Sequence, residues 1–184
     1  MRVKRTIRRA LLLAALCVSA VHLTAQDAGA RTTLPLPRFV SLKASAANVR
    51  QGPGLRYNIL WTYVRRGIPV EIFQEFGNWR RIRGSDGKSG WIYAALVSGR
   101  RTATVAPWVS DLARLRPSPS LQSAPVAHLE PGVLLHDLSC DGTWCRVSVQ
   151  HPDVTGYVRQ SALWGVYPGE TLNWSEGWNW LSFL

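Results

Sequence analysis

The sequence contains few of the side chains that hydrolases and metal sites require. Its 184 residues include four His, three Cys and 11 Asp plus Glu. The spacing of His128 and His136 matches no metal-ligand motif, and no pair of carboxylates is placed as a general acid and base. We expect Glu71 and Glu75, which share one predicted strand, to face solvent. The sequence therefore predicts no catalytic residue, no metal ligand and no cofactor, and it predicts a protein that is not an enzyme.

Long helical repeats and a complete phosphate-binding loop are also missing. No segment after residue 30 combines a long helical period of apolar residues with capping residues. The segment Gly84–Ser89 ends like a phosphate-binding loop, but Ile82 occupies the position where that loop requires its first glycine. We therefore predict neither a helical fold nor a nucleotide site.

The abundant residues favour a folded chain with many turns. The composition is 46% hydrophobic and 18% charged, which is sufficient for a core and excludes a disordered or fibrous chain. The 15 Gly and 11 Pro predict many turns. Nine Trp are many for this length, so we expect their rings either to pack in a core or to contact a ligand.

The first 25 residues have the composition of a secretory signal peptide. Five basic residues and no acid precede an apolar run, Ala10–Ala20, that ends in small residues. His22 and Thr24 interrupt this run before it reaches the length of a membrane span, so a retained anchor fits less well. The candidate cleavage sites follow Ala20, Ala25 and Ala30. The sequence therefore predicts an exported protein of the periplasm or cell envelope, with Cys17 removed along with the signal.

Positive charge is concentrated in the first half of the chain. The formal net charge is +11, from 22 Lys plus Arg and 11 Asp plus Glu. Residues 31–103 contain 13 basic and three acidic residues, whereas residues 104–184 contain four and seven. This polarity predicts either an anionic partner for the first half or contact between the two halves. Because the protein is expected to be exported, we predict that the partner is not a nucleic acid.

The chain repeats itself with an offset of 65 or 66 residues. Gly77-Asn78-Trp79 falls on Gly142-Thr143-Trp144, and Gly90-Trp91-Ile92 falls on Gly156-Tyr157-Val158. Two copies of one small domain explain these matches.

Each copy is predicted to consist of short strands. Val70–Phe76 and Trp79–Arg83 alternate apolar and polar residues around a Gly77-Asn78 turn, and Gly90–Tyr93 is another short apolar strand. Several strands within about 55 residues, with turn signals between them, predict a small, partly open barrel. The predicted fold class is therefore all-β, with two tandem barrels after a cleaved signal peptide.

Motifs of the first copy closely resemble those of the bacterial SH3-like domain. In chain order they are Ala47–Gly54, Tyr57, Arg66-Gly67, Gly77-Asn78-Trp79 and Gly90-Trp91-Ile92, and they cover nearly all of residues 44–98. The second copy departs from the family, because Arg116–Ser120 replaces the glycine-rich turn and Tyr157 replaces a Trp. The resemblance implies a small five-stranded barrel. It also implies a binding or targeting role in the cell envelope, often toward peptidoglycan or another wall polymer.

The signal, the two SH3-like copies and the tail divide the chain into six parts. They are a signal peptide (1–25), a linker (26–41), a first SH3-like domain (42–98), a linker (99–110), a divergent second domain (111–165) and a Trp-rich tail (166–184). In the tail, apolar residues recur at helix-like intervals from Trp174 to Leu184. We expect the tail to pack on the protein, and a peripheral membrane contact or a partner-binding peptide are the alternatives.

The two remaining cysteines are predicted to form a disulfide. Cys140 and Cys145 flank an Asp-Gly turn that places them across adjacent strands of a hairpin. In an exported protein such a pair favours a disulfide over free thiols.

The predicted ligand site is the loop between the first strands of copy one. Arg50, Arg56, Tyr57 and Trp61 alternate cation and aromatic, which suits the sugars and carboxylates of a wall polymer. We expect Trp79 and Trp91 to form the core or the floor of the same groove. The alternative is that Tyr57 and Trp61 pack on the barrel and the arginines form a solvated rim.

The function predicted from these features is binding within the cell envelope. Copy one is expected to recognise peptidoglycan or another wall polymer, and copy two to be mainly structural. The alternative is a periplasmic protein-interaction or scaffold protein that binds an envelope enzyme through the same groove or through the tail.

Overall fold

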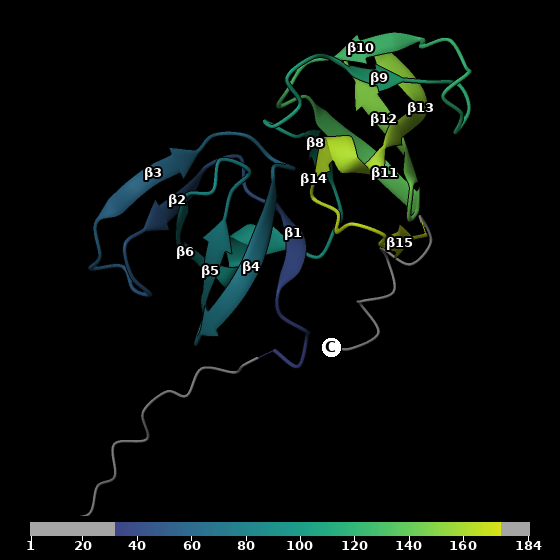
Figure 1. Cartoon of the computed structure of the whole chain (residues 1–184). Coiled ribbons are helices and arrows are strands. Elements are labelled where there is room, and N and C mark those ends of the chain that lie inside the picture. Colours follow the sequence, from purple (N-terminus) through teal and green to yellow (C-terminus); the bar gives the residue numbers. More distant parts are fainter. Residues whose placement is uncertain (1–31, 174–184) are drawn as a thin grey trace, which may run out of the picture.

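The structure, a computed structural model, describes residues 32–173 and contains two β-barrels in this range. Figure 1 shows the first barrel in purple to teal and the second in green to yellow. The described residues contain no α-helix, and none of their helices is long and apolar enough to cross a membrane. The predicted signal peptide and residues 174–184 of the tail lie outside the described range.

The first barrel is one antiparallel sheet in the order β3-β2-β6-β5-β4-β1-β7. Its strands are β1 (Arg38–Leu42), β2 (Ala47–Arg50), β3 (Ile59–Tyr63), β4 (Pro69–Phe76), β5 (Trp79–Arg83), β6 (Ser89–Tyr93) and β7 (Val97–Ser98). The 3-10 helix η1 (Ala94–Leu96) joins the last two. The strands predicted from alternation are therefore confirmed as β4, β5 and β6.

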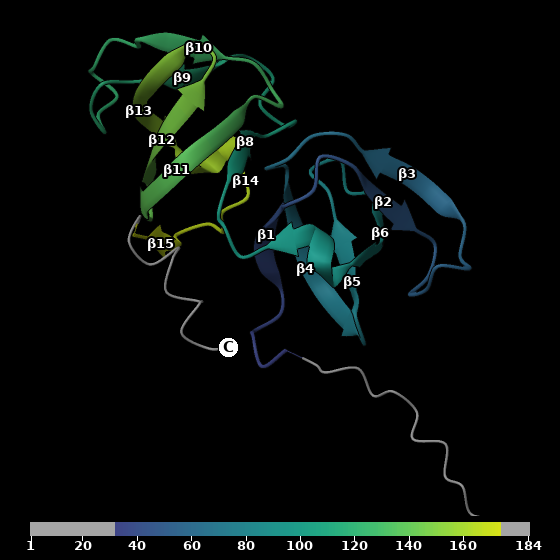
Figure 2. The ribbon, with the colours of Figure 1, turned by 180° about the vertical axis from the view of Figure 1, so that it is seen from behind.

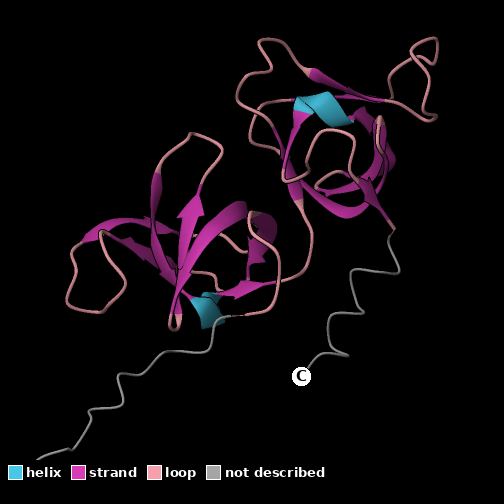
Figure 3. Cartoon of the chain, turned by 60° about the horizontal axis from the view of Figure 1, so that its bottom comes forward, coloured by secondary structure: helices cyan, strands magenta, loops and turns pink. Residues whose placement is uncertain are grey.

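The second barrel has a sheet in the order β13-β12-β11-β8-β14 and a separate pair, β10-β9. Its strands are β8 (Ala103–Val105), β9 (Ala113–Leu115), β10 (Ala127–Leu129), β11 (Leu134–Asp141), β12 (Trp144–Gln150), β13 (Asp153–Arg159), β14 (Leu163–Trp164) and β15 (Thr171–Leu172), which pairs with β11. The 3-10 helix η2 (Gln160–Ala162) lies where η1 lies in the first barrel, and Figure 3 shows both in cyan.

The sequence repeat is also a repeat of strand pairing. In the first barrel Arg50 on β2 lies opposite Trp91 on β6. In the second, Arg116 forms an isolated bridge with Tyr157. Each residue of the second pair follows its counterpart by 66 positions, since 116 − 50 and 157 − 91 both equal 66. The predicted all-β fold of two SH3-like barrels is confirmed.

Each barrel encloses a small apolar core. The first core is formed by Val40, Leu42, Ala47, Val49, Val70, Ile72, Ile82 and Ile92. The second includes Leu115, Leu135, Val147 and Val158, together with the disulfide cysteines. Because small barrels bury little apolar surface, packing one barrel on the other adds to the stability of both.

The barrels begin earlier in the chain than the predicted domain limits. Strand β1 lies largely in the expected linker 26–41, yet it pairs with both β4 and β7. Strand β8 lies in the expected linker 99–110 and pairs with β11 and β14. The connection between the barrels is therefore the short segment from Ser98 to Ala103. Figures 1 and 2 both show β1 and β14 on the facing sides of the two barrels.

Candidate functional site

An arginine holds the loop between β2 and β3 of the first barrel. Nη1 of Arg50 donates hydrogen bonds to the carbonyl oxygens of Leu55 (3.0 Å) and Tyr57 (2.8 Å). The Tyr57 ring lies directly on Gly52, since a Cβ at residue 52 would approach the ring to 2.5 Å. The loop is therefore held in one shape by the arginine on one side and by ring packing on the other.

The outer surface of this loop is apolar and exposed. Leu55 is 77% exposed, and Tyr57, Ile59 and Leu60 are each about half exposed. Arg56 lies between them and is also exposed. We call this surface, formed by Leu55, Arg56, Tyr57, Ile59 and Leu60, the loop face.

The other predicted ligand residues do not all lie beside the loop face. Trp61 packs on the core of the first barrel and makes an edge contact with Tyr63 (6.1 Å between ring centroids). Trp91 is buried outside that core cluster, opposite Arg50 on the neighbouring strand. Trp79 is half-buried and packs edge-on against Tyr93. The structure thus places Arg50 beside Trp91 and bonds it to the backbone of Tyr57, whereas Trp61 belongs to the core side of the sheet.

The two glutamates of β4 do not face solvent, so that prediction was wrong. The carboxylate of Glu75 accepts hydrogen bonds from Arg38 (2.5 Å) and Thr32 (2.7 Å) and pairs with Arg80 at 3.1 Å. Burial raises the pKa of Glu75, but the hydrogen bonds from Arg38 and Thr32 outweigh it and the pKa lies below its usual value. Glu71 is 3% exposed and forms an ion pair with Arg83. Both carboxylates are covered because the outer face of β4 packs against other parts of the protein.

Aromatic rings fill the junction between the barrels. Phe39 of β1 packs edge-on against Trp164 of β14, with ring centroids 5.0 Å apart, and contacts Tyr167 at 4.7 Å. The Tyr167 hydroxyl donates to Oε1 of Glu71 at 3.0 Å. Burial and the neighbouring Glu71 carboxylate raise the pKa of Tyr167. Tyr167 of the second barrel thus satisfies Glu71 of the first, and Phe39 of the first barrel packs on Trp164 of the second.

Polar contacts fix the orientation of the barrels at this junction. Thr102 donates from Oγ1 to the carbonyl oxygen of Gly67 (2.6 Å), and the Trp164 indole donates to the carbonyl oxygen of Pro69 (3.3 Å). Gly165 has a φ of +116°, and a Cβ there would collide with the backbone of Thr102. The close approach of these two segments of the chain therefore requires glycine at position 165.

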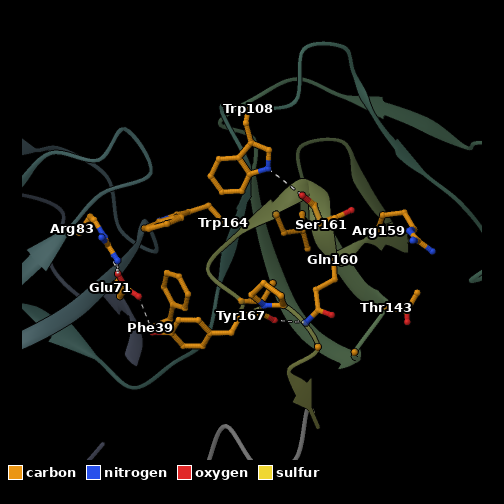
Figure 4. A pocket seen from close by; sticks show the side chains of 15 residues that line it. Phe39, Glu71, Arg83, Trp108, Thr143, Arg159, Gln160, Ser161, Trp164 and Tyr167 are labelled. Atoms are coloured by element: carbon orange, nitrogen blue, oxygen red, sulfur yellow. Dashed lines mark hydrogen bonds and ion pairs between the residues drawn. The ribbon is translucent and has the colours of Figure 1, made fainter. Parts of the chain in front are cut away.

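A cavity of about 640 Å³ opens at the junction. Figure 4 shows Trp108, Trp164, Tyr167 and Phe39 on one side, and Gln160, Arg159 and Thr143 on the other. Its size lies within the range of small-molecule sites, and its wall is mostly apolar with a few polar groups. Sequence reasoning did not find this cavity. The only sequence feature that pointed to such a cavity was the high number of Trp, but that number does not predict which rings pack together.

The predicted disulfide is present. Cys140 and Cys145 lie opposite each other on β11 and β12 and are bonded, and both are buried in the second core. The backbone N–H groups of Thr143 and Trp144 both donate to Asp141, which lowers the pKa of that carboxyl. The hairpin is thus closed by a covalent bond and by an Asp turn. No group of three or more His, Cys, Asp or Glu that could hold a metal occurs in residues 32–173.

Comparison with known proteins identifies both repeats. The sequence profile of the bacterial SH3 domain matches residues 43–99 and 109–165. No curated protein sequence matches the chain. Among solved structures, NlpC1 from Trichomonas vaginalis is 17% identical with a TM-score of 0.31, covering 73% of this chain and 48% of its own. NlpC2 from the same organism is 16% identical with a TM-score of 0.31, covering 72% and 49%. The chain thus spans about half the length of these two proteins.

Proposed function

The chain belongs to the bacterial SH3 domain family, with one domain in each barrel, and we propose that it is a non-enzymatic binding protein of the cell envelope. Its ligand is peptidoglycan or another wall polymer, recognised by the loop face of the first barrel. The observation that supports this proposal is the exposure of an aromatic and cationic loop whose shape is held by Arg50. The export signal predicted from the first 25 residues agrees with this location.

A loop that is ordered before binding loses less conformational entropy on binding. The hydrogen bonds from Arg50 and the packing of Tyr57 on Gly52 provide that order. The Tyr57 ring then offers a face for a sugar ring or a peptide group, and Arg56 offers a guanidinium for a carboxylate. Wall polymers present all of these groups.

The charge of the first barrel supports an anionic polymer. All three of its acids, Glu71, Glu75 and Asp86, are engaged in ion pairs within the protein. The exposed Arg56, Arg65 and Arg66 form no ion pair within residues 32–173. The basic surface is therefore available to carboxylates of a wall polymer, which raises the rate of encounter as well as the affinity.

Sedimentation with isolated peptidoglycan tests the proposal. We expect saturable binding at low salt, with an affinity reduced about tenfold or more by Tyr57→Ala combined with Arg56→Ala, which corresponds to about 1.4 kcal/mol. The sequence repeat supplies a matched control, because Leu121 lies 66 positions after Leu55 and is also exposed. Leu55→Ala should weaken binding, whereas Leu121→Ala should leave it unchanged.

An interaction with an envelope protein is the second candidate. The loop face favours it as well, since exposed leucine, isoleucine and tyrosine side chains are common in protein interfaces. Failure of the intact protein to sediment with peptidoglycan at low salt would reject the wall polymer and leave this alternative.

A further inference from the structure

Strand β3 has one edge without a partner strand. It is a terminal strand of the first sheet, and among residues 32–173 it pairs only with β2. Figures 1 and 2 both show β3 on the side of the first barrel that lies away from the second barrel. Ile59 and Leu60 are about half exposed, and Val64, directly after the strand, is 79% exposed. The backbone N–H and C=O groups along this edge are therefore open to pairing with a further strand.

The edge of β3 lacks the features that normally prevent such pairing. Edge strands of natural proteins are very short, or they carry charged residues or Pro. The run Tyr57–Val64 is eight residues long and contains no charged residue, no Pro and no Gly. The terminal strands β7, β13 and β14 differ, since β7 and β14 have two residues each and β13 begins at Asp153 and ends at Arg159. The edge of β3 is thus the one that suits an added strand.

The strand is held in one shape before any partner arrives. It pairs with β2 from Tyr63 to Ile59, and Oγ1 of Thr62 donates to Oδ1 of Asn48 at 2.7 Å. The hydrogen bonds from Arg50 hold the loop that precedes it. Because β3 is already ordered, a partner strand loses less of its binding free energy to the ordering of this protein.

The side chains of β3 alternate between the core and solvent. Trp61 and Tyr63 are half-buried and pack on the core of the first barrel, whereas Leu60 and Thr62 are exposed. An added strand would place every second side chain beside Trp61 and Tyr63, which favours β-branched or aromatic residues at those positions.

Arginines at both ends of the uncharged run decide which strand fits. Arg56 precedes the run and Arg65 and Arg66 follow it, and all three are exposed without an ion pair in the part of the chain that the structure describes. If two copies of the chain paired antiparallel along the whole run, Tyr57 would lie opposite Val64, and Arg56 opposite Arg65 at both ends. These like-charge pairs oppose a dimer, whereas acidic residues at the ends of an added strand would pair with the arginines.

From these features we propose that β3 binds an extended peptide strand of another protein, in which acidic residues flank an uncharged, partly apolar run. The peptide joins the first sheet beside β3 through main-chain hydrogen bonds, and its terminal acids pair with Arg56, Arg65 and Arg66. This site goes beyond the proposed recognition of a wall polymer, because it uses the backbone edge of β3 and not the side chains of the loop face.

Peptide capture by the full chain tests this site. Two octapeptide libraries are compared, with Glu or Lys at both ends and Val, Ile, Thr, Ser, Tyr or Phe at every position between them. We expect the immobilised protein to retain peptides of the Glu library. In calorimetric titration, the tightest of these should bind at least tenfold more strongly than the same peptide with Lys ends.

Charge reversal on the protein supplies the matching variants. Arg65→Glu combined with Arg66→Glu should weaken binding of the Glu-ended peptide at least tenfold. Arg114→Glu combined with Arg146→Glu is the control, because these two arginines are exposed on β9 and β12 of the second barrel. The control should leave binding unchanged, and thermal melting of each variant confirms that the fold is intact.

N-methylation separates backbone pairing from side-chain contact. In a strand, the N–H groups of alternate residues point to the same edge. The tightest peptide is therefore made in two forms, each methylated on the amides of one edge. We expect one form to lose binding and the other to keep it, because only one edge of the peptide faces β3. Hydrogen exchange of the β3 amides should also slow when the unmethylated peptide is bound.

Several results would overturn the proposal. They are no retention of the Glu library, equal affinity for Glu and Lys ends, and full binding by both methylated forms. A dimer of the intact protein that Thr62→Lys abolishes would also reject it, since a second copy would then occupy the edge. Sedimentation with peptidoglycan tests the loop face separately, so the proposed function stands if only the peptide site fails.

Discussion

The hydroxyl group of Tyr167 in the second barrel donates a 3.0 Å hydrogen bond to Oε1 of Glu71 in the first. The other oxygen of this carboxylate pairs with Arg83. Because Glu71 is only 3% exposed, both of its oxygens need partners, and one of them comes from the other barrel. The two SH3 domains are therefore joined by a buried polar contact as well as by aromatic packing.

Tyr167→Phe is predicted to destabilise the protein by about 1–3 kcal/mol, because it leaves one oxygen of a buried carboxylate without its donor. Thermal or urea unfolding measures this loss. Tyr57→Phe is the matched control, since within residues 32–173 the exposed Tyr57 hydroxyl forms no hydrogen bond. Equal stability of Tyr167→Phe and the wild type would show that the hydrogen bond contributes nothing.

The contribution of Tyr167 should also depend on alkaline pH. Burial and the hydrogen bond to Glu71 raise the pKa of Tyr167 above its usual value of 10.0. A raised pKa in the folded state contributes stability that is fully present below the unfolded value and is lost as the pH rises above it. The stability difference between the wild type and Tyr167→Phe should therefore narrow above pH 10, as followed by urea unfolding at several pH values.

Arg50→Ala is predicted to destabilise the first barrel by about 1–3 kcal/mol, because the carbonyl oxygens of Leu55 and Tyr57 both lose a charged donor. Arg56→Ala serves as the control, because Arg56 is exposed and its side chain forms no hydrogen bond to the part of the chain that the structure describes, residues 32–173. Hydrogen exchange of the loop amides should increase in the first variant and stay the same in the second. An unchanged loop in Arg50→Ala would mean that the arginine does not hold it.

In the second barrel an arginine also holds the equivalent loop by bonding to its backbone. Arg116 donates from Nη1 to the carbonyl oxygen of Ser123, and Ser123 follows Tyr57 by 66 positions. The sequence predicted a loop in this part of the chain, and residues 51–58 do connect β2 and β3; that this loop binds a ligand stays a prediction. The sequence did not predict that the Arg50 guanidinium bonds to backbone carbonyl groups, because every residue has such a group and the sequence does not show which ones accept a bond.

The strands were predictable because their signal is local. Alternation and the Gly77-Asn78 turn define β4 and β5 within a few residues of chain. The cavity lacks such a signal, since Phe39, Trp108 and Trp164 come from distant segments and meet only through the orientation of the barrels. The burial of Glu71 has the same origin, because an outward position on a strand becomes covered when a second barrel packs on it.

Glu75→Gln is predicted to lower stability near neutral pH, because Arg38 and Arg80 then face a neutral amide. The hydrogen bonds from Arg38 and Thr32 outweigh burial and hold the pKa of Glu75 below its usual value of 4.5. A lowered pKa contributes stability above the unfolded value that is lost as the pH falls through the folded one. The wild type and Glu75→Gln should therefore have similar free energies of unfolding below pH 4. A stability difference that stays the same below pH 4 would show that the charge of Glu75 does not stabilise the fold.

Reduction of the Cys140–Cys145 disulfide is predicted to cost about 2 kcal/mol, at the low end of the usual range because the closed loop is short. The melting temperature should fall with dithiothreitol in the wild type and stay constant in a Cys140→Ser, Cys145→Ser double variant. Thiol titration of the unreduced protein should find neither cysteine reactive, and two reactive thiols would refute the bond.

Binding to peptidoglycan is predicted to weaken with salt but not to vanish. Exposed charges act over about 10 Å at 0.1 M salt and about 3 Å at 1 M, so the contribution of Arg65 and Arg66 is screened. The contact of Tyr57 with the polymer is not, because ring packing does not depend on ionic strength. Arg65→Ala combined with Arg66→Ala should therefore flatten the salt dependence, whereas Tyr57→Ala should lower the affinity at every salt concentration. Sedimentation across a sodium chloride series separates the two effects. If the affinity of the wild type for peptidoglycan does not change with salt concentration, these arginines have no role in binding.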